Sequence, residues 1–99
     1  MTITEVKGEG TIQLNVEGQV DTVTAPELQQ KILTSFQKSN DVVLDLGQVG
    51  YMSSAGLRAL LLGQKTAQSK GGKLHIINVQ DSVMQVFRMS GFSKILTIE

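Results

Sequence analysis

Short apolar runs alternate with longer amphipathic segments through most of this chain. The runs DVVLDLG (residues 41–47) and KLHIINV (residues 73–79) are nearly continuous in apolar residues, as is typical of strands covered on both faces. A segment of helical period follows each run, over residues 54–69 and residues 81–92. A strand, a helix and a second strand in this order predict parallel βαβ units, which restricts the chain to an α/β fold.

The two ends of the chain complete the predicted sheet. TITEV (residues 2–6) and TIQLNVEG (residues 11–18) alternate apolar and polar residues, and KGEG between them supplies glycines for a tight reversal. These segments predict an antiparallel hairpin, and KILTI (residues 94–98) predicts a last strand. We therefore expect one α/β domain over residues 1–99, with a mostly parallel sheet, an N-terminal antiparallel hairpin and the order β-β-α-β-α-β-α-β.

The first predicted helix has a recognisable start and an apolar side. Thr24, with Glu27 three residues later, has the pattern of a capping box, and Pro26 falls in the first turn, where a missing N–H is tolerated. An apolar stripe follows at helical spacing, made of Leu28, Ile32, Leu33 and Phe36. The stripe predicts that this helix packs one side against the core.

The last predicted helix is bounded by similar signals. Asp81 or Ser82 is expected to cap its start. Gly91 suits the left-handed position after its end, which would let Phe92 fold back on Phe87.

Composition and charge argue against several classes of function. Nine basic and nine acidic residues give zero formal net charge, which argues against a nucleic-acid-binding protein. The chain has no cysteine and one histidine, His75, expected to be a packed strand residue, so we expect no metal and no cofactor. No apolar run approaches the roughly 20 residues of a membrane span, and the N-terminus lacks a signal-peptide pattern. We expect a cytoplasmic protein.

Two adjacent serines, Ser53 and Ser54, lie where the run 41–47 gives way to the helix 54–69. In α/β sheets, binding sites gather in the loops after the carboxyl ends of strands. A serine here can cap the helix, act as a nucleophile, or accept a phosphate, which the positive end of a helix favours. Nucleophilic catalysis lacks a base, because His75 lies within an apolar run, and the G-x-S-x-G spacing is absent. We therefore expect no enzyme, with a serine hydrolase the weakest hypothesis.

The neighbours of the serines offer further signals. Gly56 lowers helix propensity in the first turn, and a plain cap does not need it. It indicates either close approach by another surface or tight packing of helix against strand. Tyr51 and Met52 precede the serines, and we expect them to contact a partner if exposed and to anchor the loop if buried.

The sequence resembles the STAS domain of bacterial anti-sigma factor antagonists. The resemblance rests on VVLDLGQVGYMSSAGLRALL (residues 42–61), in which an apolar strand ending in Asp leads to a Ser-Ser-x-Gly-Leu helix start. GQVDTVTAPEL matches the second loop and first helix of that family, and VMQVFRMSGFSKIL matches its last helix and strand. The resemblance implies a protein that binds an anti-sigma factor, itself a serine kinase of the GHKL ATPase type, and thereby frees the sigma factor.

The same resemblance implies a cycle of phosphorylation. The kinase would phosphorylate Ser54, with Ser53 as the alternative acceptor, the complex would dissociate, and a PP2C-type phosphatase would reset it. Ser53 stands where the family often has Asp, and Asp21 matches an acidic residue near the acceptor. We expect the partner surface to comprise Asp21, Thr22, Tyr51, Met52, Ser53, Ala55, Gly56 and Arg58. Arg58, one turn after Ser54, is expected either to contact the partner or the phosphate or to be an ordinary solvated helix residue.

The expected effect of phosphorylation is electrostatic. A phosphate adds about −1.5 to −2 charges near pH 7, which a helix N-terminus tolerates but an apolar or acidic interface does not. We therefore expect release of the partner by repulsion and desolvation, without refolding. The alternative function is a STAS subunit that is never phosphorylated, in a transport complex such as a lipid-transport ABC system or in a stress-signalling assembly.

Overall fold

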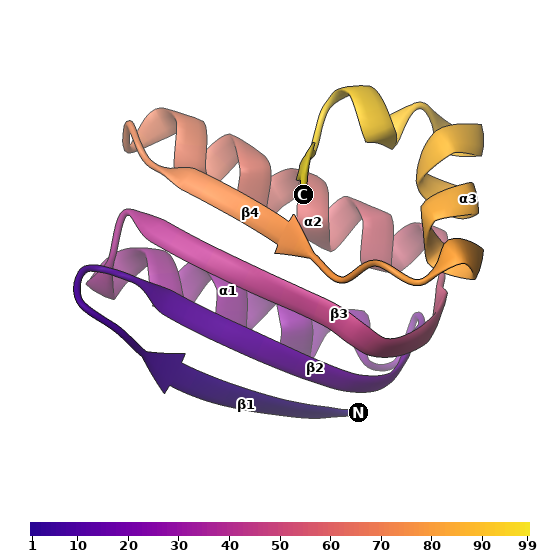
Figure 1. The fold of residues 1–99 in the computed structure, drawn as a ribbon, viewed down its shortest axis with the longest axis horizontal. Coiled ribbons are helices and arrows are strands. Elements are labelled where there is room, and N and C mark those ends of the chain that lie inside the picture. Colours follow the sequence, from indigo (N-terminus) through magenta and orange to yellow (C-terminus); the bar gives the residue numbers. More distant parts are fainter.

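The computed structural model describes every residue from Met1 to Glu99. The elements follow the predicted order (Figure 1), with the bounds β1 Thr2–Lys7, β2 Ile12–Val20, α1 Ala25–Lys38, β3 Asp41–Met52, α2 Ser54–Ser69, β4 Lys73–Ile77, α3 Asp81–Ser90 and β5 Thr97–Ile98. A short 3₁₀ helix, Phe92–Lys94, joins α3 to β5. None of the helices combines the length and the apolar character needed to cross a membrane.

The five strands form one sheet in the order β1-β2-β3-β4-β5. β1 runs antiparallel to β2, and all other neighbours are parallel, which confirms the predicted fold class. Apolar side chains form rows across the strands: Leu14 of β2 lies beside Leu44 of β3, which lies beside Ile76 of β4. On β1, Ile3 lies opposite Val16, whereas the charged Glu5 lies opposite Leu14 at the end of this row.

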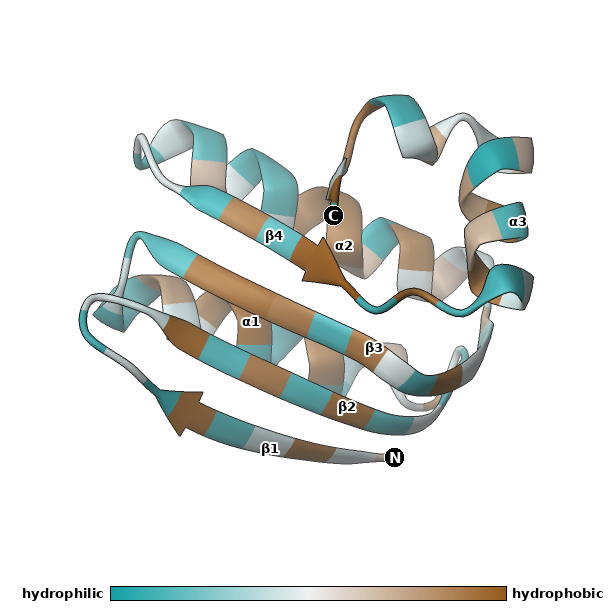
Figure 2. Ribbon diagram, viewed as in Figure 1, coloured by the Kyte–Doolittle hydropathy of each residue, from teal (hydrophilic) through white to brown (hydrophobic).

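The helices leave one face of the sheet open. In Figure 1, α1 and α2 pass behind the strands, and α3 lies at the end of the sheet where β3 and β4 finish. Burial alternates along these strands, and the hydropathy colours of β2 alternate with it (Figure 2). The prediction that residues 41–47 and 73–79 are covered on both faces is therefore wrong. On the open face Val43 and Ile77 are only half-buried, because no helix covers them.

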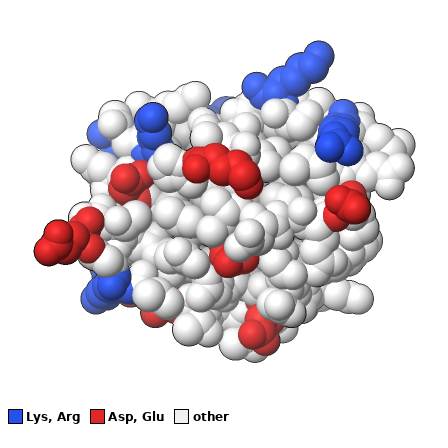
Figure 3. Space-filling view, in the orientation of Figure 1, with Lys and Arg blue, Asp and Glu red and all other residues white.

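The open face is turned toward the viewer in Figure 3. The side chains of Lys and Arg lie near its margin, and acidic side chains are scattered between uncharged ones. The balance of charge in the sequence is thus matched by a mixed surface on this side of the molecule.

One hydrophobic core fills the space between the sheet and the helices. Its completely buried residues come from β2, β3, β4 and all three helices: Leu14, Val20, Leu28, Ile32, Val42, Leu44, Leu46, Val49, Leu60, Leu74, Ile76 and Phe87. The predicted stripe of α1 is confirmed at Leu28, Ile32 and Phe36, whereas Leu33 is partly exposed. The core is continuous, so displacement of one helix would expose apolar surface on the others.

The start of α1 corrects the predicted capping box. The Thr24 hydroxyl donates to the Gln19 carbonyl at 2.8 Å and accepts from the Asp21 N–H at 2.9 Å. It is therefore engaged in the preceding loop and makes no capping bond to the helix. The Glu27 N–H bonds instead to the backbone carbonyl of Thr24, at 3.1 Å.

The start of α3 also differs from the prediction, since neither Asp81 nor Ser82 caps it. Gln80 is the N-cap residue, and its carbonyl accepts from the N–H groups of Val83 at 3.0 Å and Met84 at 2.8 Å. Asp81, the first of the two expected caps, is therefore already the first residue of the helix, and the N-cap position lies one residue earlier at Gln80.

The C-terminal strand is shorter than predicted. Gly91 has the expected left-handed backbone, with φ of 82°. The chain is still turning after it, because the Leu96 N–H bonds to the Phe92 carbonyl at 2.9 Å. Only Thr97–Ile98 then pairs with β4, instead of the predicted residues 94–98.

The side chain of Gln64 on α2 is buried without a complete set of partners. It is only 9% exposed, and its Oε1 atom has no hydrogen-bond partner. A buried acceptor left unpaired costs about 1–3 kcal/mol. We expect Gln64→Met, which keeps the length of the side chain and removes the amide, to raise the free energy of unfolding by about 1 kcal/mol in urea titrations. A decrease would contradict the assignment of Oε1 as unpaired.

Candidate functional site

The candidate site lies where β2 and β3 end side by side. The parallel register continues to Val20 and Met52 at the ends of the two strands, and the Ser53 N–H then donates to the Val20 carbonyl at 2.8 Å. The loop after β2 and the first turn of α2 are consequently neighbours (Figure 1). This is the carboxyl edge of the parallel strands, where the sequence predicts a binding site.

The end of β3 shows which of Tyr51 and Met52 is exposed and which is buried. β3 continues beyond the predicted run 41–47 through residues 48–52, because Gln48, Tyr51 and Met52 pair with β2 across two register shifts. Tyr51 is 50% exposed and Met52 only 2% exposed. Met52 therefore anchors the end of β3 in the core, which corrects the expectation that it contributes to a partner surface. Tyr51 is exposed, as we expect of a residue that contacts a partner.

Ser53 and Ser54 have different environments. Ser53 is the N-cap of α2, and its hydroxyl accepts from the Gly56 N–H at 3.3 Å. The Ser53 carbonyl accepts from the Leu57 N–H at 3.0 Å, which begins the helical ladder. Ser53 is half-buried, whereas Ser54, the first residue of the helix, is exposed. The capping role therefore belongs to Ser53, and the Ser54 hydroxyl is left without a role in the fold.

The first turn of α2 has an uncompensated positive end. It contains no acidic residue, and the only N–H group bound by the cap is that of Gly56. The remaining N–H groups of the first turn and the helix dipole favour negative charge at this position. Arg58, one turn after Ser54, is exposed and adds a full positive charge on the same helix.

Gly56 is buried and contacts the end of both strands. A Cβ atom at this position would lie 2.4 Å from Met52 Sδ and 2.8 Å from Val20 Cγ1. Of the two explanations for this glycine, the structure supports tight packing of helix against strand. Gly56 therefore does not lie on the surface, which corrects its assignment to the partner-binding set, and its neighbour Ala55 is half-buried.

Asp21 organises the loop between β2 and α1. Its Oδ1 atom accepts from the N–H groups of Val23 and Thr24, both at 3.0 Å, and at 3.1 Å shares the proton of the Thr24 hydroxyl with the Gln19 carbonyl. The hydrogen bond from the Thr24 backbone is the main cause that lowers the pKa of Asp21 below its usual value. The charged carboxylate thus fixes the loop shape and leaves Thr22 and Val23 exposed.

An exposed surface surrounds Ser54. A shallow groove between the first turns of α1 and α2 is lined by Thr22, Ala25, Pro26, Gln29, Gln30, Ala55 and Arg58. Val23, at 85% exposed, stands beside Asp21 and Thr22 in the adjoining loop. The sequence interpretation missed Val23 and the α1 side of the groove. An apolar residue between two threonines was the one available signal.

The single histidine makes no contact with either serine. His75 lies on β4 and pairs with Asp41 and Glu99. No three or more His, Asp or Glu side chains are grouped so that they could hold a metal ion. The arrangement around Ser54 therefore offers an exposed hydroxyl, a positive helix end and a groove, without a neighbouring imidazole base.

Comparison with known proteins finds one matching family. The STAS domain family model matches residues 3–99. The chain is 29% identical over 92 residues to the anti-sigma-B factor antagonist of Bacillus subtilis, covering 93% of this chain and 84% of that protein. It is 30% identical over 99 residues to the anti-sigma-B factor antagonist of Listeria monocytogenes, covering 96% and 86%.

A solved structure shares the fold. The Bacillus cell fate determinant SpoIIAA in its phosphorylated form superposes with a TM-score of 0.76 at 18% identity, covering 99% of this chain and 91% of that one. The arrangement of sheet and helices described above is therefore the arrangement found in that protein.

The contact of Gly56 with two core side chains yields a stability prediction. We expect Gly56→Ala to lower the free energy of unfolding by about 1–2 kcal/mol, because overpacking against Met52 and Val20 exceeds the gain in helix propensity. Urea unfolding of Gly56→Ala, Val20→Ala and the double variant measures this. The double variant should lose less than the sum of the single losses, since Val20→Ala removes the clashing Cγ1 atom. Strictly additive losses would argue against the close contact.

Proposed function

Because the chain belongs to the STAS domain family, we propose that it is an anti-sigma factor antagonist controlled by phosphorylation of Ser54. In the unphosphorylated state it binds an anti-sigma factor and so frees a sigma factor. The names of the relatives from Bacillus subtilis and Listeria monocytogenes support this role. The partner we propose is a serine kinase of the GHKL type, with a PP2C-type phosphatase reversing the modification, all in the cytoplasm.

The division of roles between the two serines carries the proposal. The Ser53 hydroxyl is half-buried and accepts a hydrogen bond that begins α2, so its modification would remove the cap. The Ser54 hydroxyl is exposed and has no structural partner, so a kinase can reach it without disturbing the helix. This contrast supports Ser54 as the acceptor and argues against Ser53.

The surface around Ser54 has the character of a protein-binding site. Val23 and Tyr51 are exposed apolar and aromatic side chains; Val23 adjoins Thr22, which lines the groove between α1 and α2, and Tyr51 lies on β3 three residues before Ser54. Aromatic and apolar anchors surrounded by polar groups are typical of protein interfaces. We assign to the partner surface Asp21, Thr22, Val23, Tyr51, Ser53, Ala55 and Arg58. Met52 and Gly56 support this surface from beneath.

The switch follows from the charge of the phosphate. About −1.5 to −2 charges at Ser54 would be stabilised by the free N–H groups and the dipole of α2. The same charge in a closed interface would have to be desolvated against the partner. The modification therefore removes the partner and leaves the fold of the antagonist intact.

Phosphorylation and binding measured together test this function. With the kinase partner and ATP, phosphopeptide mass spectrometry should place the phosphate on Ser54 in the wild type and in Ser53→Ala, and find none in Ser54→Ala. Calorimetry should show that Ser54→Asp weakens binding at least tenfold. Ser69→Asp, at the opposite end of α2, places the same charge away from the site and should bind as the wild type does.

The Ser53 variant separates capping from control. Ser53→Ala should lower the free energy of unfolding by about 1 kcal/mol while the protein remains a substrate. Phosphate on Ser53 in place of Ser54, or unchanged binding by Ser54→Asp, would contradict the proposed switch.

A further inference from the structure

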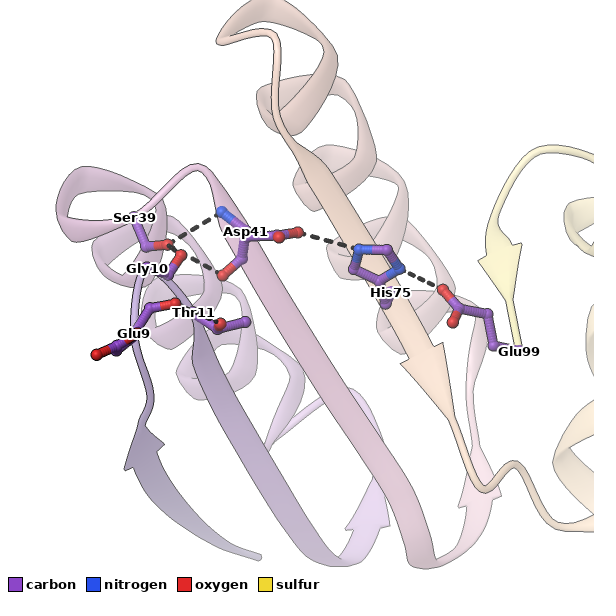
Figure 4. A network of polar contacts seen from close by, with 7 residues as sticks. All are labelled: Glu9, Gly10, Thr11, Ser39, Asp41, His75 and Glu99. Carbon is purple, nitrogen blue, oxygen red and sulfur yellow. Dashed lines mark hydrogen bonds and ion pairs between the residues drawn. The ribbon is translucent and has the colours of Figure 1, made fainter.

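His75 lies between two carboxylates on the open face of the sheet. Figure 4 shows its ring on β4, with Asp41 of β3 on one side and Glu99 beyond β5 on the other. His75 Nε2 is 3.0 Å from Asp41 Oδ1, and His75 Nδ1 contacts Glu99 Oε2. The side chain links the first residue of β3, the middle of β4 and the residue that follows β5, away from Ser54.

The hydrogen-bonding chemistry of His75, Asp41 and Glu99 favours the protonated form of His75. An ionised carboxylate can only accept a hydrogen bond, and a neutral imidazole has one N–H to donate. Neutral His75 would therefore turn an unprotonated nitrogen toward one of the two carboxylates. The imidazolium donates from both nitrogens and matches both Asp41 and Glu99.

We propose that protonated His75 is a latch that fastens the C-terminal strand β5 to the sheet, and that its deprotonation releases the segment from Thr97 to Glu99. The latch is a regulatory device at the edge of the sheet, separate from the site at Ser54.

The geometry indicates which side of the latch opens. Asp41 begins a strand that has neighbours on both sides, and its backbone N–H bonds to the Ser39 hydroxyl at 3.0 Å. Glu99 follows a strand of two residues, whose continuation is one bond from the Glu99 N–H to the Ile76 carbonyl at 2.8 Å. Loss of one ion pair therefore matters little at Asp41 and much at Glu99.

The charged groups around His75 determine the direction of the pH effect. Glu99 is the main cause that raises the pKa of His75 above its ordinary 6.5, partial burial opposes it, and Asp41 adds to the increase. Lys73, two residues earlier on β4, lines the same surface hollow as His75 and Asp41, and its positive charge acts against protonation. A pKa raised on folding means that the stabilisation is complete below about pH 6.5 and is lost as the pH rises through the raised value. The latch is therefore closed at pH values below the raised pKa of His75 and opens at pH values above it.

Opening would have a local structural consequence. Leu96, only 5% exposed, is the buried residue that immediately precedes β5, and Ile95 beside it is already 49% exposed. Release of residues 97–99 would uncover the backbone edge of β4 at His75 and Ile76, which β5 otherwise occupies. The bonds that hold the Ser54 region are at the other end of the strands and do not involve these residues.

A nuclear magnetic resonance titration of the whole protein tests the latch. The ring signals of His75 report its pKa, and heteronuclear NOE values of the Ile98 and Glu99 amides report the mobility of the segment. In the wild type, we expect the NOE values to fall over the pH range in which His75 loses its proton. In Glu99→Gln and Asp41→Asn the pKa of His75 should move down toward 6.5. His75→Gln should show a mobile segment at every pH.

Glu17→Gln is the matched control, because Glu17 pairs with Thr2 and Gln48 and lies away from His75. It should leave both the pKa of His75 and the NOE values unchanged. Two results would overturn the latch. One is a pKa of His75 in Glu99→Gln equal to that of the wild type. The other is a constant NOE at Ile98 and Glu99 through the whole titration of His75 in the wild type.

Discussion

The parallel pairing of β2 with β3 is the interaction on which the rest of the structure depends. It runs from Ile12 and Val42 to Val20 and Met52, and the Ser53 N–H continues it by one further hydrogen bond to the Val20 carbonyl. Because two strand ends are held together, the loop organised by Asp21 and the first turn of α2 face the same side of the molecule. Gly56 permits this closeness, since any larger residue would meet Val20 and Met52. Met52 and Gly56 are buried on either side of Ser54, and Ser54 itself is exposed at the first position of α2.

Local patterns in the sequence predicted the elements and the helix that bears the serines. Periodicity gave α2 its observed bounds and the hairpin its direction, because amphipathic spacing and glycine turns act over a few residues. Tertiary contacts decided what could not be predicted. Residues 48–52 lie beyond the predicted run 41–47 and become a strand through pairing with β2. Thr24 looks like a cap, but the carbonyl of Gln19 and the N–H of Asp21 occupy its hydroxyl. The burial of Met52 and the exposure of Val23 likewise depend on packing that no single segment contains.

The surface around Ser54 and the edge strand β5 differ in how firmly they are held in the structure. At the carboxyl edge, backbone pairing, the Asp21 loop and a tightly packed helix keep the surface around Ser54 in one shape. At β5, a strand of two residues is held by its pairing with His75 and Ile76 of β4, by one further backbone bond from Glu99 and by the contact of Glu99 with His75. A preorganised surface suits the proposed site, which would bind a partner and receive a charge without refolding. A weakly held edge suits a response to solution conditions that does not disturb that surface.

We propose that a phosphate on Ser54 acts at the surface and leaves the fold unchanged. Backbone amide spectra of the unphosphorylated and the Ser54-phosphorylated protein, compared with each other, distinguish this mechanism from a conformational change. We expect chemical-shift changes confined to residues 21–24 and 53–58, with the amide signals of β2, β3 and β4 unmoved. Changes spread through the sheet, or loss of the protected core amides, would show that phosphorylation acts by changing the conformation, and a switch confined to the surface would be wrong.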